Sequence, residues 1–344
     1  MGRRRSPCGP SPAIGEASMD SPPAPADAPG GPSRPPADRA KEGVLAILRG
    51  VAQVDLQPGH WTGLIFLVAL FAGGWQFGAF GLLGCVTATL TAWSFGVPWK
   101  RVSAGLEGFS GTLVGVGLVL YLGASWVTLL VVIGAAIGAS MVNSALNVLL
   151  KPYGLPALTA PFCVVTLLML IAAPSFHRVW ARHPGNVAPS VAHPGTAVSW
   201  TDVWHGFFNG FGQVFFQDKW YVGLIFLVGL AVSSRTVAAV ACAASLIGLL
   251  MGWWLGAQAA DLGAGLYGYN SVLAGIALAG TFVVLGPVSL VYAAVGAATA
   301  AVTTPAITNT FSIIGGHALT WPFVLVTWVF LGAVPTLSTL RRTT

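Results

Sequence analysis

Four polar side chains recur as two matched pairs in a mostly apolar chain. Gln53 is matched by Gln213 in a repeated Gln-Val dipeptide, and Thr159 is matched by Thr320 in a repeated Leu-Thr-x-Pro-Phe. Amide and hydroxyl groups both donate and accept hydrogen bonds, so they can replace the water around an uncharged, amide-like solute without attracting ions. The alternative is that they join helices or satisfy backbone groups freed near prolines. Because both pairs recur, we favour a shared solute pathway.

An aromatic ring and a leucine recur in the same way. The sequence GLEGFSGTL, which contains Phe109 and ends at Leu113, returns as GLYGYNSVL, which contains Tyr269 and ends at Leu273. Each ring lies four residues before its leucine, so the two side chains share one helix face. Two flat rings from two repeats would form a slot that admits a planar molecule and excludes a hydrated ion, because rings do not replace the ion's water. The alternative is that each ring packs against lipid or another helix.

The composition indicates the class of protein. Hydrophobic residues make up 55% of the 344 residues, charged residues only 8%, and the mean hydropathy is +0.77. A soluble chain carries about a quarter charged residues. Several segments here run for about 20 residues without a charge, which is enough to cross a bilayer core. The sequence therefore predicts an all-α polytopic membrane protein.

The apolar elements form two sets. GLIFLV at 63–68 returns at 223–228, and ALTAPF at 157–162 returns as ALTWPF at 318–323. We expect helical elements at 43–56, 61–73, 75–95, 102–122, 126–149 and 157–173, and again at 203–216, 220–232, 236–255, 264–284, 287–309 and 318–335. The first element is too short to span a membrane. We therefore expect two repeats, each with five transmembrane helices and one half-spanning pore helix. This gives ten spans, and five crossings per repeat invert the second repeat.

The distribution of positive charge supports this topology, because cytoplasmic loops collect Lys and Arg. With the N-terminus inside, all 16 Lys and Arg residues fall on the cytoplasmic side except Arg178, Arg182 and Lys219. We therefore expect a multi-pass protein of the cell membrane with both termini in the cytoplasm.

The same topology defines the expected domains. They are a disordered cytoplasmic tail (1–42), a first transmembrane repeat (43–174), an extracytoplasmic connecting loop (175–202), a second, inverted repeat (203–336) and a short cytoplasmic tail (337–344). The N-terminal tail is rich in Pro, Ala, Gly and Ser and has too few apolar residues to fold alone. It lacks the continuous apolar region of a signal peptide.

Ionisable groups are scarce in the apolar segments. Glu107 is the clearest case, while Asp55 and Asp261 lie near predicted helix ends. Proton coupling and ion pumping normally require such groups at depth, so we expect a neutral solute that moves passively. The sequence offers no nucleophile with a base and no metal-ligand spacing. We therefore expect no enzyme activity, no cofactor, no metal and no nucleic-acid partner.

The repeated G-L-x-G-[FY]-[NS]-x-x-L, Gln-Val and L-T-x-P-F motifs resemble those of the urea transporter family over about residues 45–335. This resemblance implies two inverted halves and a homotrimer in membrane lipid with one pore per subunit. It also implies channel-like conduction of urea down its gradient, through a flat apolar slot whose edge is lined by oxygen atoms.

The resemblance also implies roles for particular residues. The slot would be formed by Phe109, Leu113, Tyr269 and Leu273. The two outer binding sites would be bordered by Gln53, Val54, Gln213 and Val214. The constricted middle would be lined by Thr159 and Thr320.

Three residues depart from the family's pattern. Tyr269 stands where Phe is expected, Ser110 stands where Asn is usual, and Glu107 places a carboxylate two residues before Phe109. These departures leave open a channel for other small neutral solutes, such as short amides, urea analogues, ammonia or water.

Overall fold

The computed structural model describes residues 36–180 and 197–343. A compact unit spans Ala40–Thr344. The predicted N-terminal tail lies outside the described residues up to residue 35, and the centre of the predicted connecting loop, 181–196, also lies outside them. The last residues of the predicted tail are helical, because α1 already begins at Pro36.

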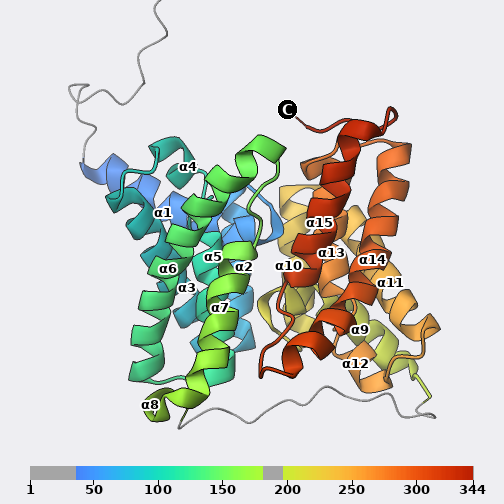
Figure 1. Cartoon of the computed structure of the whole chain (residues 1–344), viewed down its shortest axis with the longest axis horizontal. Helices are drawn as coiled ribbons and strands as arrows, with labels where there is room; N and C mark the ends of the chain where they lie inside the picture. The colour runs from blue at the N-terminus through green and yellow to red at the C-terminus, as the bar shows by residue number, and fades with distance from the viewer. Residues whose placement is uncertain (1–35, 181–196, 344) are drawn as a thin grey trace, which may run out of the picture. The chain divides into compact units, whose positions relative to one another are not determined.

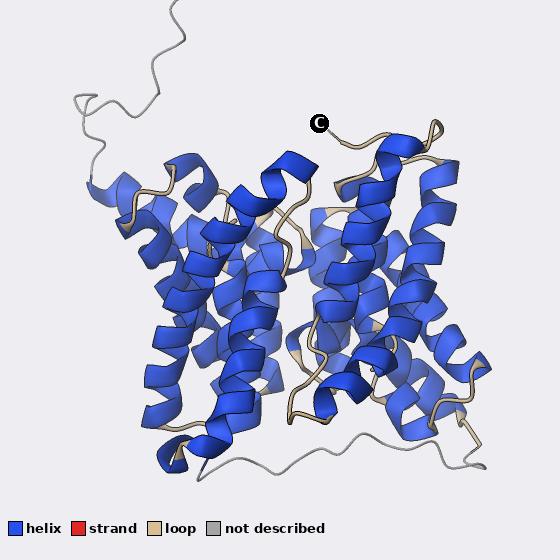
Figure 2. Ribbon diagram, in the orientation of Figure 1, coloured by secondary structure: helices blue, strands red, loops and turns tan. Residues whose placement is uncertain are grey.

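The described residues form helices joined by short loops, with no strand beyond an isolated bridge between Val283 and Arg342 (Figures 1 and 2). The elements of the first half are α1 (Pro36–Ala52), η1 (Gln53–Asp55), α2 (His60–Gly73), α3 (Trp75–Ser94), α4 (Trp99–Ser103), α5 (Phe109–Leu122), α6 (Trp126–Leu150), η2 (Lys151–Tyr153), α7 (Ala160–Ala172), η3 (Ala173–Ser175) and α8 (His177–Trp180). Those of the second half are α9 (Trp200–Gly212), η4 (Gln213–Phe215), α10 (Trp220–Ser233), α11 (Arg235–Trp254), α12 (Ala259–Gly263), α13 (Tyr269–Ile276), η5 (Ala277–Thr281), α14 (Pro287–Ser312), α15 (Trp321–Ala333) and η6 (Val334–Thr336).

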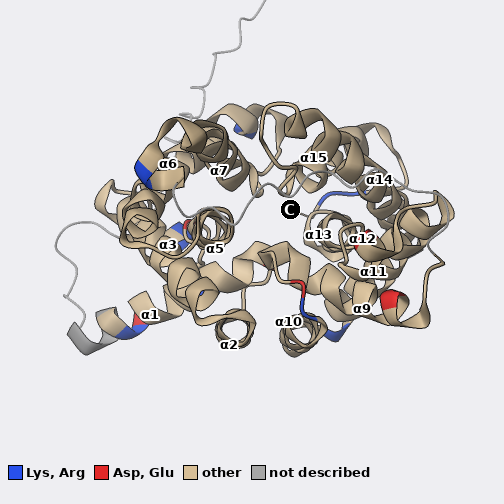
Figure 3. Ribbon diagram, turned by 90° about the horizontal axis from the view of Figure 1, so that it is seen from below, with Lys and Arg blue, Asp and Glu red and all other residues tan. Residues whose placement is uncertain are grey.

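Several of these helices are suited to a membrane. By length and composition, α3, α6, α11 and α14 could each cross a bilayer, and the number rises from 4 to 6 when two bent helix pairs are counted as spans. The bends are 76° between α1 and α2 and 73° between α9 and α10. The helices α5, α7 and α15 are apolar but shorter. Few positions are charged (Figure 3). The chain is therefore an all-helical, multi-pass membrane protein, and the ten spans stay a prediction.

The second half repeats the elements of the first in the same order. Helices α10 to α13 begin 160 residues after α2 to α5, as from His60 to Trp220, and α14 and α15 begin 161 residues after α6 and α7. The backbone repeats its exceptions too. The described non-glycine residues with left-handed φ fall into two matched pairs, which are Leu56 (61°) with Phe216 (58°) and Leu158 (51°) with Leu319 (48°). Bulky side chains disfavour this conformation, so its recurrence indicates that surrounding contacts impose it in both halves.

The repeated glycine motif starts with a turn, and this corrects two predicted boundaries. The predicted helix 102–122 is interrupted between α4 and α5, because Gly105 has a φ of +79° and a Cβ there would lie 2.4 Å from the carbonyl carbon of Arg49. In the second half, α13 ends at Ile276 and passes into a π-helical turn that contains Gly280 at φ 116°. The predicted helix 264–284 is therefore a turn, a short helix and a π-helical segment.

Close backbone contacts hold α3 against α5. A Cβ on Gly84 would lie 2.0 Å from the carbonyl oxygen of Gly111, and a Cβ on Gly111 would lie 2.2 Å from the carbonyl oxygen of Gly84. Only glycine at both positions permits this approach, since real Cβ atoms do not come so close to an oxygen. Gly111 of the first motif and Gly84 of α3 thus position the helix that carries Phe109 and Leu113.

The two halves meet along α2 and α10, which lie side by side in Figure 3. The hydroxyl of Thr62 donates to the carbonyl of Gly229 over 3.1 Å. The Lys219 ammonium donates to the carbonyl of Gly73 over 2.8 Å. The rings of Phe66 and Phe226 pack edge to face at 5.0 Å. Helices α7 and α15 form a second contact between the halves.

Candidate functional site

The matched threonines meet where the two halves touch. The Oγ1 atoms of Thr159 and Thr320 are 2.7 Å apart, and either can donate the hydrogen bond. Their residues are 3% and 1% exposed. Each threonine stands immediately before a helix, α7 or α15, and immediately after a left-handed leucine. This geometry turns both hydroxyls toward one point, where their remaining lone pairs can accept hydrogen bonds from an N–H group.

A cysteine extends this polar contact. The Sγ atom of Cys163 lies 3.1 Å from the Oγ1 of Thr320. Cys163 is free and buried, and a lone cysteine in an apolar segment is expected from the sequence to act as a small hydrophobe. Its contact with the threonine pair was missed. The available signal was its position four residues after Thr159, which puts both side chains on one face of a helix.

Tyr269 uses its hydroxyl to reach the backbone beside Thr320. The ring is 8% exposed, and the hydroxyl donates to the carbonyl oxygen of Leu319 over 2.8 Å. Phe109, the matched ring in the first half, is partly buried against the core and has no hydroxyl to make such a bond. Leu113 and Leu273 are fully buried one turn further on. That these four side chains form one slot stays a prediction.

The matched glutamines do not bond to each other. The amide of Gln53 donates to the carbonyl of Ala104 over 3.1 Å, and that of Gln213 donates to the carbonyl of Ala264 over 2.9 Å. Their neighbours Val54 and Val214 are core residues at 1% and 0% exposure. Each amide therefore holds the turn that precedes α5 or α13. This is a structural role, as in the alternative that these side chains satisfy backbone groups.

Two carboxylates are buried in the first half. Glu107 is 2% exposed and pairs with Arg101 over 2.8 Å. Asp55, which the sequence placed near a helix end, is 1% exposed, and its Oδ1 has no hydrogen-bond partner. The matched position in the second half carries Phe215, whose ring stacks on Phe226 at 4.4 Å. The two halves therefore differ in buried charge although they share a fold.

Four rings that are far apart in the sequence form an aromatic cluster, which consists of Tyr121, Phe162, Phe216 and His317. Tyr121 stacks on His317 with ring centres 4.2 Å apart, and Phe216 packs against both Tyr121 (6.3 Å) and Phe162 (5.9 Å). His317 lies in the loop before α15, where burial lowers its pKa below the usual range. The cluster joins α5, the residue that follows η4, α7 and that loop, next to the residues that precede Thr320.

The first-half positions that correspond to His317 and Phe216 carry Pro156 and Leu56, and the second-half counterpart of Tyr121 is Thr281. Among the described residues, the counterparts of three of the four rings are therefore not aromatic, and the aromatic cluster is not repeated.

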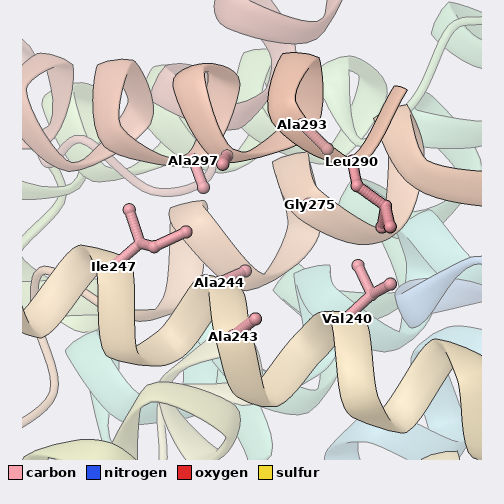
Figure 4. Close-up of a pocket in the computed structure, with 9 residues that line it drawn as sticks. Val240, Ala243, Ala244, Ile247, Gly275, Leu290, Ala293 and Ala297 are labelled. Carbon is pink, nitrogen blue, oxygen red and sulfur yellow. The ribbon is translucent and has the colours of Figure 1, made fainter. Parts of the chain in front are cut away.

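A small cavity lies between α11, α13 and α14 (Figure 4). Its volume is about 50 Å³. The lining residues are Val240, Ala243, Ala244, Ile247, Gly275, Leu290, Ala293, Ala294 and Ala297. Because these side chains are apolar, the cavity offers nothing to hydrogen-bond a polar solute. The threonine pair is the better candidate site.

The fold and the buried polar contact between its halves define a multi-pass helical membrane protein with a duplicated core. The family model described as "Urea transporter" matches residues 44–335. The chain is 30% identical to Urea transporter 1 of Ovis aries over 291 residues. The aligned residues make up 83% of this chain and 75% of that protein. Urea transporter 1 of Rattus norvegicus is 28% identical with the same coverage. The chain belongs to the urea transporter family, as its repeated motifs predicted.

Proposed function

We propose that this protein conducts urea passively across a membrane. The observation that carries the proposal is the family match over residues 44–335, and the threonine contact between the halves supports it. Urea is flat, uncharged and rich in N–H donors. A pathway that offers hydroxyl acceptors between apolar walls suits such a molecule. It disfavours ions, because apolar walls do not replace the water that an ion loses.

The pathway that we propose runs between the two halves. Thr159 and Thr320 line its middle and accept hydrogen bonds from the urea NH2 groups. The side chains proposed to form the flat slot are Phe109, Leu113, Tyr269 and Leu273. Those proposed to border the two outer sites are Gln53, Val54, Gln213 and Val214. The glutamine bonds to Ala104 and Ala264 support this placement indirectly, because they fix the turns from which the rings project.

The proposed architecture is a pair of inverted repeats with ten spans. The matched order of elements and the matched left-handed residues support the duplication. An odd number of crossings per repeat then inverts the second half, as in many transport proteins. We further propose a homotrimer in the lipid of the cell membrane, with both termini in the cytoplasm. The distribution of Lys and Arg supports this orientation.

The proposal is tested by urea efflux from liposomes that contain the purified protein. Light scattering after a urea jump should show rapid shrinking and reswelling, faster than in empty liposomes. The rate should not change when a proton or sodium gradient is imposed. Flux that required either gradient would contradict passive conduction.

A channel for other small neutral solutes is the second candidate. It is favoured by the hydroxyl of Tyr269, which occupies a lone pair of the Leu319 carbonyl next to Thr320. Fewer free acceptors favour a solute with fewer N–H donors than urea. A panel of urea, acetamide, dimethylurea, ammonia and water separates the two candidates, and the solute with the highest permeability relative to empty liposomes decides between them.

A further inference from the structure

The buried carboxylate of Glu107 receives hydrogen bonds on both of its oxygen atoms. The Nε of Arg101 donates to Oε1 over 2.8 Å, and the Nδ2 of Asn143 donates to Oε2 over 2.7 Å. Asn143 also donates to the carbonyl of Leu106 over 3.3 Å. These bonds tie the turn before α5 to α4 on one side and to α6 on the other. Phe109 is the first residue after this turn.

The contacts require a group at position 107 that only accepts hydrogen bonds. The Nδ2 of Asn143 faces two acceptors, while its Oδ1 accepts from the Nδ2 of Asn147 over 3.1 Å. Turning the amide over would place its oxygen against the carboxylate and against a carbonyl. Asn143 therefore presents N–H to Glu107, and Arg101 has only donors to offer. A glutamine at 107 would direct its NH2 at one of these two donors.

The second half fixes its ring by other bonds. Tyr269 donates to the Leu319 carbonyl through its hydroxyl. The next residue, Asn270, donates to the Oγ1 of Thr304 over 3.0 Å and accepts from the backbone N–H of Phe323 over 3.2 Å. Thr304 is the counterpart of Asn143. The ring and its neighbour thus hold the start of α13 directly.

The first half lacks the side chains that make these three bonds. Phe109 has no hydroxyl, and Ser110 stands where the second half has Asn270. The Oγ of Ser110 is buried without a hydrogen-bond partner. The bonds that replace them are those of Glu107, two residues before the ring. In the second half, the polar bonds that hold the ring lie at the start of α13. In the first half they lie in the turn before α5.

We infer that Glu107 is a positioning residue for Phe109, and that its bonds to Arg101 and Asn143 set the width of the solute slot. This inference rests on the proposed urea conduction. Glu107 does not contact the solute in this assignment. It holds the turn from which the first ring projects, as the hydroxyl of Tyr269 and the amide of Asn270 do for the second ring.

The test compares Glu107→Gln and Arg101→Gln with Lys100→Gln in liposomes. Lys100→Gln is the matched control, because Lys100 is exposed and carries the same charge on the same helix, α4. The measured quantity is the ratio of dimethylurea to urea permeability. A loosened ring admits the wider solute, so we expect this ratio to rise about fivefold in Glu107→Gln, the change that one lost hydrogen bond gives. It should rise less in Arg101→Gln and stay unchanged in Lys100→Gln.

A purely structural role predicts a different result. It lowers the thermal midpoint and scales all permeabilities together, which leaves the ratio at the wild-type value. That outcome in Glu107→Gln and Arg101→Gln would overturn the inference. If Glu107→Gln does not fold, Arg101→Gln decides alone, since Arg101 is 38% exposed and its removal leaves the bond from Asn143 in place. Wild-type protein that conducts no urea would instead contradict the proposed function.

Discussion

The hydroxyls of Thr159 and Thr320 give the first prediction. Replacing either by Val keeps the shape of the side chain and removes both the donor and the acceptor, so the urea NH2 groups lose a partner in the middle of the pathway. We expect urea permeability to fall roughly tenfold, as one or two lost hydrogen bonds imply. Stopped-flow light scattering on liposomes measures this.

The matched control for both threonine variants is Thr166→Val. Thr166 is a buried threonine of α7 whose hydroxyl has no hydrogen-bond partner. The Thr166→Val variant should leave urea permeability unchanged. If Thr159→Val and Thr320→Val behaved like this control, the threonine pair would serve helix packing only.

The hydroxyl of Tyr269 gives the second prediction. Tyr269→Phe removes the bond to Leu319 and frees that carbonyl as an acceptor, while Asn270 still holds the start of α13. The preference between urea and acetamide, which has fewer N–H donors, should therefore shift toward urea. It should also reduce the free energy of unfolding by about 1 kcal/mol. Tyr292→Phe is the control, because Tyr292 donates to the carbonyl of Phe330 over the same 2.8 Å away from the threonine pair. Equal solute preferences in the two variants would show that the Tyr269 hydroxyl is only structural.

The sequence identified the chemistry of the site better than its contacts. The threonine pair was singled out because it recurs, and the structure brings its hydroxyls together. The bond from Gln53 to Ala104 joins residues 51 apart, and no local pattern specifies such a partner. The sequence alone favours a small inert hydrophobe at Cys163, because a lone cysteine in an apolar segment usually is one. Its contact with Thr320 depends on how the two halves pack.

The glycine crossing of α3 and α5 gives the third prediction. Gly84→Ala or Gly111→Ala would force a methyl group against a backbone oxygen, at 2.0 or 2.2 Å. Backbone cannot move aside cheaply, so we expect a loss of at least about 1–3 kcal/mol of stability. A fall in the thermal midpoint in detergent measures it. Gly134→Ala in α6 is the control, because a Cβ there meets nothing within 4 Å. Equal midpoints for all three variants would disprove the close crossing.

Helices were predicted well where apolar sequence runs unbroken, as in α3 and α11. The errors fall at the repeated glycine motif, where the apolar pattern continues through a turn. Hydropathy does not register that Gly105 has a left-handed φ and lies too close to the backbone of Arg49 to carry a side chain. The predicted helix is wrong in the same way at both copies of the motif, because the same packing recurs in each half.

Passive conduction gives the fourth prediction, and it concerns the protein as a whole. Burial lowers the pKa of His317, so its imidazole stays neutral at pH 7 and above. The titration of His317 should therefore leave urea flux constant between about pH 7 and pH 8, because its pKa lies below the usual histidine value of about 6.5. Urea permeability measured across this interval, with and without a sodium gradient, checks it. Urea flux that changed with the sodium gradient, or with pH across this interval, would contradict this prediction.

The aromatic cluster has a consequence for molecules that bind without passing through. A passive pore cannot favour one direction of net flux when urea is equal on both sides, however different its two ends are. A flat aromatic blocker is not bound by this restriction. In the proposed inverted arrangement, the cluster and its counterparts Pro156 and Thr281 face opposite sides of the membrane, so such a compound can stack on His317 and Tyr121 from one side only. Inhibition by such a compound should therefore be sided, acting from one face of the membrane, although the transport it blocks has no preferred direction.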